Sequence, residues 1–185
     1  MASQPTFGRY TEIPIDRMSK EQREAYEKVS NTPGSFLGPY KIWAENPALM
    51  NLMIPIGVYY KEHFSLNDAE REIATILVVS KIGVPFGICK HEQTAKEAGI
   101  PAEKVERMII GLPVVFDDPR QDAIYEVTTA LINSRYVPLG LYKRAVQLLG
   151  NNGVSDVTVI LGYYTMVSYT LAFHDVPSNA EGLKR

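Results

Sequence analysis

Apolar residues recur at helical spacing along almost the whole chain. The stretch 65–82 shows this best, with one face formed by Leu66, Ala69, Ile73, Ile76 and Leu77. Ser19 followed by Gln22 has the spacing of a helix capping box, and Asn46 before Pro47 is another helix start. Strand-like alternation is rare. The pattern predicts an all-α protein with no sheet.

Turn residues divide the chain into about seven to nine helical segments. Gly83 and Pro85 separate the two most regular ones, and Pro55 is expected to kink its own helix. The expected helices are 21–29, 40–45, 47 past 56, 65 to the turn at 83, 85–99, 101–110, 119 past 131, 138–149 and 155–174. Ser65 and Ser155 are the expected caps of the fourth and last of these.

Length and composition narrow the class of protein. A chain of 185 residues that is 45% hydrophobic and 22% charged is typical of one globular domain. A net charge of −2 argues against a nucleic-acid surface. No apolar run reaches the ~20 residues of a membrane span, and no signal-peptide pattern is present. With a lone cysteine, Cys89, we expect a cytoplasmic protein without nucleic-acid or membrane partners.

Two polar residues lie on or beside apolar helix faces. His91 shares a face with Ile88 and Ala95, and a buried imidazole without a hydrogen-bond partner loses about 1–3 kcal/mol. Taken alone, this pattern favours a structural histidine. Glu72 lies at the edge of the preceding apolar face, and the pattern alone favours a surface carboxylate near a helix start, like its neighbour Glu70.

The other reactive side chains do not form a recognisable site. Cys89 lies about 200° around a helix from His91, so we expect a small buried hydrophobe. His63, His91 and His174 have no metal-ligand spacing, and we expect neither a metal nor a cofactor. Most of the eleven tyrosines are expected in the core or in a subunit interface.

Taken together, Glu72, His91 and their helices resemble the carboxymuconolactone decarboxylase family, which includes the alkylhydroperoxidase D-like proteins. The peroxidase branch of that family carries Glu-x11-Cys-x2-Cys-x3-His. With His91 as the histidine, the glutamate falls on Glu72 and the cysteines fall on Val84 and Gly87. The segments that also resemble the family are Leu66–Ser80, Ala95–Gly99, Phe36–Pro39 and Phe116–Arg120. The likeness covers about residues 15–177 and implies one alkylhydroperoxidase D-like multi-helix domain over 1–185.

The resemblance also implies a function. Peroxide reduction needs a thiolate and a resolving thiol, which Val84 and Gly87 cannot supply. The resemblance therefore indicates a cofactor-independent lyase or isomerase acting on a small carboxylated or carbonyl compound. His91 would be the general acid/base, and Glu72 would hold its tautomer. The residues expected to line the substrate pocket are Phe36, Phe86, Tyr163 and Tyr164.

Two alternatives remain open at this point. A non-catalytic binding protein would keep the scaffold and its apolar pocket, and a hydroperoxide reductase would use Cys89 with an external thiol. For a substrate carboxylate the sequence offers only Arg120 and Arg135, neither of which has supporting evidence.

The turn Gly83-Val84-Pro85 predicts a hairpin of two helices. A straight hairpin would leave Glu72 and His91 offset by roughly 7 Å in height. We nevertheless expect the carboxylate within hydrogen-bond reach of His91, directly or through one water, at the wall of an apolar pocket. The last helix, 157–173, is apolar almost all round and predicts a homo-oligomer, whether a dimer, a trimer or a hexamer.

Overall fold

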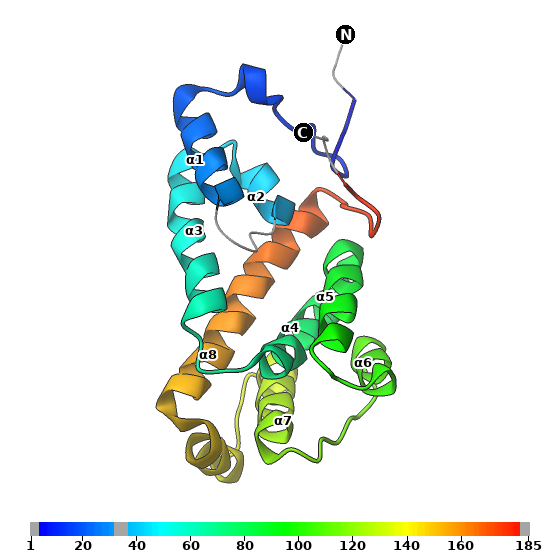
Figure 1. Ribbon diagram of the computed structural model, residues 1–185. Helices are drawn as coiled ribbons and strands as arrows, with labels where there is room; N and C mark the ends of the chain where they lie inside the picture. The colour runs from blue at the N-terminus through cyan, green and yellow to red at the C-terminus, as the bar shows by residue number, and fades with distance from the viewer. Residues whose placement is uncertain (1–3, 32–36, 182–185) are drawn as a thin grey trace. The chain divides into compact units, whose positions relative to one another are not determined.

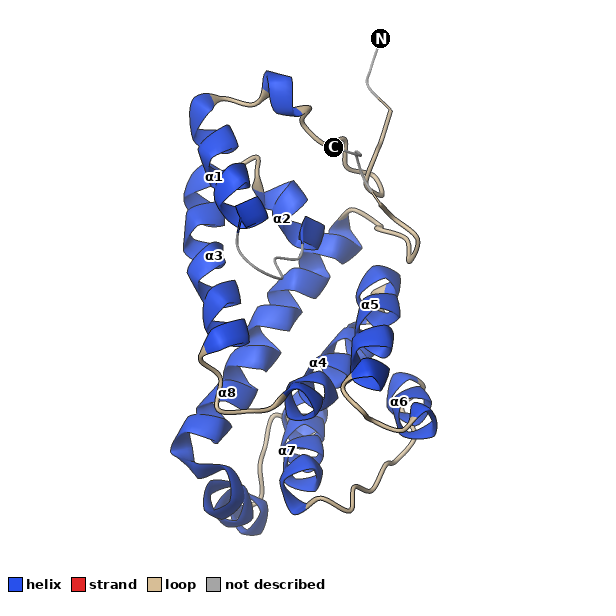
Figure 2. Cartoon of the chain, viewed as in Figure 1, coloured by secondary structure: helices blue, strands red, loops and turns tan. Residues whose placement is uncertain are grey.

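The computed structural model describes residues 4–31 and 37–181 (Figures 1 and 2). In these ranges every regular element is a helix, apart from one isolated bridge between Phe7 and Tyr10. The all-α prediction is confirmed. The helices are η1 (Ile15–Arg17), α1 (Lys20–Asn31), α2 (Leu37–Trp43), α3 (Pro47–Glu62), α4 (Asp68–Ile82), α5 (Pro85–Glu97), α6 (Ala102–Ile109), α7 (Pro119–Ser134) and α8 (Leu139–Phe173).

Side-chain caps fix where several helices begin. Ser19 and Gln22 exchange the two hydrogen bonds of a capping box, and Asn46 accepts from the Leu49 amide. The cap of α4 is Asn67 rather than Ser65. The Ser65 hydroxyl instead donates to Asp156 Oδ2 at 2.7 Å, so Ser65 is committed to a contact with α8.

The last two expected helices are one element, α8, interrupted only at Gly150. Gly150 has φ 69° and ψ 173°, a conformation that glycine adopts at little cost. The helix resumes directly after it, so Ser155 lies inside α8 and is not a cap. The interruption between residues 149 and 155 was predicted correctly, whereas the prediction that Ser155 caps a helix was wrong.

The chain packs into two compact units. Phe64–Tyr169 forms one, in which α4 contacts α5, α6 and α7. Met1–His63 and Thr170–Arg185 form the other, in which α1, α2 and α3 pack together. The prediction of a single domain over 1–185 stays a prediction.

The end of α8 joins the N-terminal segment within its own unit. Trp43 Nε1 donates to Thr170 Oγ1 at 3.2 Å, and the Arg9 amide donates to the His174 carbonyl at 2.6 Å. The His174 ring packs edge-on against Tyr10, with centroids 5.5 Å apart.

Acidification is expected to destabilise this unit through His174. Burial lowers the pKa of His174, so the folded chain resists the proton that the unfolded chain takes up. Stability is therefore retained above the ordinary histidine pKa near 6.5 and is lost as the pH falls below it. Thermal unfolding at pH 7.5 and 5.5 measures this. The drop in melting temperature between pH 7.5 and pH 5.5 should be smaller in His174→Gln than in the wild type. An equal drop in both proteins would contradict the prediction.

None of the described helices is long and apolar enough to span a membrane. The homo-oligomer stays a prediction, which sedimentation at micromolar concentration would measure. Tyr169 and Phe173 on α8 leave 62% and 78% of their surface exposed, which a second copy could cover.

Candidate functional site

A tight turn joins the two helices that carry the predicted pair. Gly83 ends α4 in the left-handed conformation at φ 78°, with its amide donating to the Val79 and Ser80 carbonyls. Pro85 begins α5 two residues later. Gly87 lies on the buried side of α5 facing Val79 of α4, where an added Cβ would make ordinary van der Waals contact at 3.4 Å. The Gly83 cap and the Pro85 helix start together define the α4–α5 hairpin.

The hairpin brings Glu72 and His91 into direct contact. Glu72 Oε2 lies 2.8 Å from His91 Nδ1, so the predicted contact is confirmed. The carboxylate side chain is only 6% exposed, whereas the imidazole is 18% exposed. A buried acceptor therefore holds a ring that is still partly accessible.

The hydrogen bond selects the tautomer of the ring. A carboxylate can only accept, so with Glu72 ionised the hydrogen is on Nδ1 and the lone pair is on Nε2. Among the described residues, His91 forms no second hydrogen bond. Nε2 is consequently the nitrogen that could take up or deliver a proton.

Aromatic rings from α8 lie next to the pair. The buried Tyr164 ring meets the His91 ring edge-on, at 88° with centroids 4.8 Å apart. Tyr163 packs edge-on against Tyr164 at 5.2 Å. Of the four predicted pocket residues, Tyr164 contacts the His91 ring, and Tyr163 contacts Tyr164. Phe86 is buried on α5 with the Lys90 ammonium 5.9 Å from its ring, and Phe36 lies outside the described residues.

Glu70 is not the surface carboxylate that the sequence suggested. It is 2% exposed, and Arg120 Nε donates to its Oε1 at 2.6 Å while Nη2 donates to Oε2 at 3.2 Å. Arg120 Nη1 also donates to the Leu148 carbonyl, and the bonds to Glu70 raise the pKa of the guanidinium. Glu70 lies about 200° around α4 from Glu72, so Glu70 pairs with Arg120 whereas Glu72 contacts His91.

These contacts change the assignment of the two arginines. The guanidinium of Arg120 is engaged by Glu70 and is not a receptor for a substrate carboxylate. Arg135 is exposed at the C-terminal cap of α7 and has φ 57°. The structure therefore gives neither arginine a supported role beside Glu72 and His91.

The expectation that Cys89 is a small buried residue is wrong. The thiol is exposed, because the buried side of α5 is formed by Phe86, Gly87 and Ala95 and Cys89 lies on another face. Cys89 and His91 still lie about 200° apart around α5, so the thiol does not face the imidazole. Within the described part of the chain, no group of three His, Cys, Asp or Glu residues could hold a metal ion.

Comparisons with known proteins identify the fold. No family model and no curated protein matches the sequence. The structure is similar to an uncharacterized peroxidase-related protein from Silicibacter sp. TM1040, with a TM-score of 0.74 and 15% identity over 98% of this chain and 97% of that one. It is also similar to the alkylhydroperoxidase AhpD core of an uncharacterized peroxidase-related protein from Ralstonia eutropha JMP134. That match has a TM-score of 0.71 and 12% identity over 92% and 91% of the two chains.

The chain has the alkylhydroperoxidase AhpD-core fold. This confirms the fold that the family resemblance implied. At such low identity the AhpD-core likeness extends to the architecture alone, and the chemistry of this chain depends on its own residues.

Proposed function

We propose that this protein is a cofactor-independent lyase or isomerase that moves a proton at a carbon beside a carbonyl group. Its substrate would be a small carboxylated or carbonyl-bearing molecule. The observation that carries the proposal is the 2.8 Å contact between the buried Glu72 carboxylate and the partly exposed His91 ring. This arrangement leaves Nε2 as the proton-transferring atom and provides a fixed negative charge behind it.

In an isomerisation, Nε2 would remove a proton from the carbon next to the carbonyl, and the electron pair of that bond would form an enolate. The imidazolium would then return the proton at another position. In a decarboxylation, the carbon–carbon bond to the carboxylate breaks, carbon dioxide leaves, and the enolate takes its proton from Nε2–H. In both cases Glu72 stabilises the imidazolium, and the edge of Tyr164 limits rotation of the ring.

Deuterium incorporation tests this proposal across a range of candidate substrates. The protein is incubated in D2O with a panel of β-keto acids and carboxylated lactones, and proton NMR follows exchange or loss of carbon dioxide. Turnover by the wild type that His91→Gln loses supports proton transfer by this pair. Turnover that His91→Gln retains would overturn it and leave a binding protein on the same scaffold.

A second candidate function is hydroperoxide reduction through Cys89. It is favoured by the exposure of the thiol and by the peroxidase-related proteins that share the fold. Against it, the Cys89 thiol lies about 200° around α5 from His91, so the imidazole is not beside it to assist the thiol, and Val84 and Gly87 supply no second sulfur within the chain.

We therefore expect no thiol-peroxidase activity from this chain. Consumption of hydrogen peroxide or cumene hydroperoxide with dithiothreitol as the reductant should equal the rate without protein. Cys89→Ser provides the matched control. Rapid turnover in the wild type that is absent from Cys89→Ser would replace the proton-transfer proposal with a peroxidase.

A further inference from the structure

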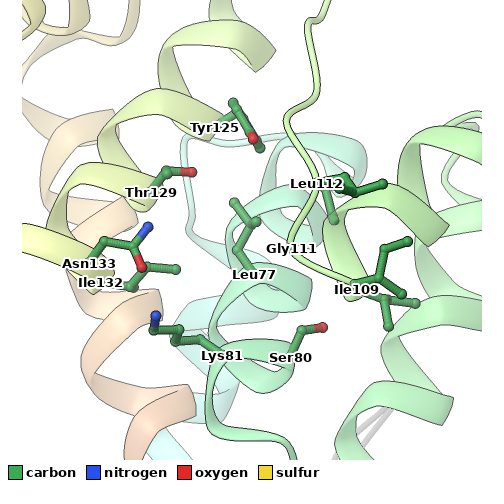
Figure 3. A pocket seen from close by; sticks show the side chains of 12 residues that line it. Leu77, Ser80, Lys81, Ile109, Gly111, Leu112, Tyr125, Thr129, Ile132 and Asn133 are labelled. Carbon is green, nitrogen blue, oxygen red and sulfur yellow. The ribbon is translucent and has the colours of Figure 1, made fainter.

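A partly open cavity of about 320 Å³ lies within the unit Phe64–Tyr169, among α4, α6 and α7 (Figure 3). Leu77 and Met108 form buried parts of its wall, and exposed residues such as Leu112 form its rim. Neither Glu72 nor His91 lines it. Leu77 lies about 140° around α4 from Glu72, so the cavity is a separate site from the proton-transfer pair. Its volume is within the range of small-molecule pockets.

Two buried hydroxyl groups in the cavity lining have no hydrogen-bond partner among the described residues. They are Ser80 Oγ on α4 and Thr129 Oγ1 on α7. A hydroxyl on a helix can bond to the carbonyl four residues before it, as Thr94 does at 3.0 Å, but these two do not. Thr128 and Ser168 also have unpaired buried hydroxyls, away from the cavity. Because such groups are unfavourable when unpaired, a polar ligand atom would satisfy those in the lining.

The charged group of the lining is a lysine. Lys81 is exposed and forms no ion pair within residues 4–31 and 37–181. In Figure 3 its ammonium lies on the side of Ile132 and Asn133, and Asn133 offers an amide that can donate. The lining contains no Asp or Glu. A cation and neutral donors beside an apolar wall suit an anionic head on an apolar body.

We propose that this cavity binds a small amphipathic carboxylate. The carboxylate is held by Lys81 and Asn133, with Thr129 as an additional donor, and the apolar body lies against Leu77 and Met108. The volume of about 320 Å³ is large enough to admit a ligand the size of octanoate, which has roughly ten non-hydrogen atoms. The site is independent of the function proposed for Glu72 and His91.

Calorimetric titration of the full chain with octanoate and with octanamide tests the proposal. Octanoate should bind at one site per chain and more tightly than octanamide. Lys81→Gln and Thr129→Val should each weaken octanoate binding by about 3- to 10-fold, the effect of losing one hydrogen bond. Lys81→Gln should also remove the preference over octanamide. Lys143→Gln, an exposed lysine away from the cavity, is the matched control and should bind as the wild type does.

Thermal unfolding without ligand separates a ligand site from a structural role. Thr129→Val removes an unpaired buried hydroxyl, so its melting temperature should equal or exceed that of the wild type. His91→Gln should bind octanoate normally, which keeps this result distinct from the outcome of the proton-transfer experiment. Absence of octanoate binding at millimolar concentration, or equal affinities for octanoate and octanamide, would overturn the proposal. So would wild-type affinity in both cavity variants.

Discussion

Replacing Arg120 by methionine is expected to lower the free energy of unfolding by about 2–3 kcal/mol. The change leaves the 2%-exposed Glu70 carboxylate without its counter-ion, and removing one partner of a buried ion pair typically costs about 3–5 kcal/mol. The Arg120 side chain is 37% exposed, so water replaces part of what is lost, and the expected cost falls at or below the lower end of that range. Urea unfolding followed by circular dichroism measures the difference.

A double-mutant cycle shows whether the pair itself carries this energy. Glu70→Gln removes the charge but keeps an oxygen for the Asn67 amide, so adding Arg120→Met to it should cost less than Arg120→Met alone. Arg144→Met is the matched control, because Arg144 and its partner Glu126 are 46% and 41% exposed and such pairs contribute about 0–1 kcal/mol. If Arg120→Met and Arg144→Met lowered the free energy of unfolding equally, burial of Glu70 would not be the reason for the cost of losing Arg120.

Replacing His91 by glutamine is expected to reduce turnover by about 10²- to 10⁴-fold, the usual contribution of a positioned acid/base. The amide of glutamine can still donate to Glu72, so the hairpin should remain folded, but it has no group that exchanges a proton near neutral pH. The loss should therefore appear in kcat rather than in KM. Initial rates on a substrate found in the D2O panel measure it.

Two further variants show that the effect belongs to the pair. Glu72→Gln keeps an acceptor for Nδ1–H but removes the charge behind the imidazolium, so it should also lower kcat. His63→Gln changes the exposed histidine at the end of α3 and should leave the rate unchanged. Wild-type rates in both His91→Gln and Glu72→Gln would remove the catalytic interpretation and leave the contact as a structural one.

The α4–α5 hairpin could be predicted because its determinants are local. The turn needs a glycine for positive φ at Gly83, and Pro85 begins the next helix directly, so the residues between the two helices are few. Once both helices are fixed, the spacing places Glu72 and His91 on facing sides. The direct 2.8 Å contact follows from local sequence combined with a recognised pattern.

The remaining features depend on contacts distant in sequence. Arg120 is 50 residues from Glu70, and no local pattern pairs them. A glutamate near a helix start is favourable at the surface, so the local sequence indicated an exposed Glu70. Ser65 does not cap α4, because its hydroxyl donates a hydrogen bond to Asp156, which is 91 residues away in the sequence. The exposure of Cys89 depends on which side of α5 faces its neighbours, which a short amphipathic helix does not settle.

The Glu72–His91 contact places a limit on how the length of this region can change. The two residues are 19 positions apart, and each residue inserted or deleted within a helix turns everything beyond it by about 100°. One extra residue between Glu72 and Gly83 would preserve the turn but direct the carboxylate away from α5. Gaps in this region should consequently be rare among proteins that retain the pair. A glutamate and a histidine at this fixed interval across a Gly-x-Pro turn therefore form a signature with which distant relatives of this chain can be sought.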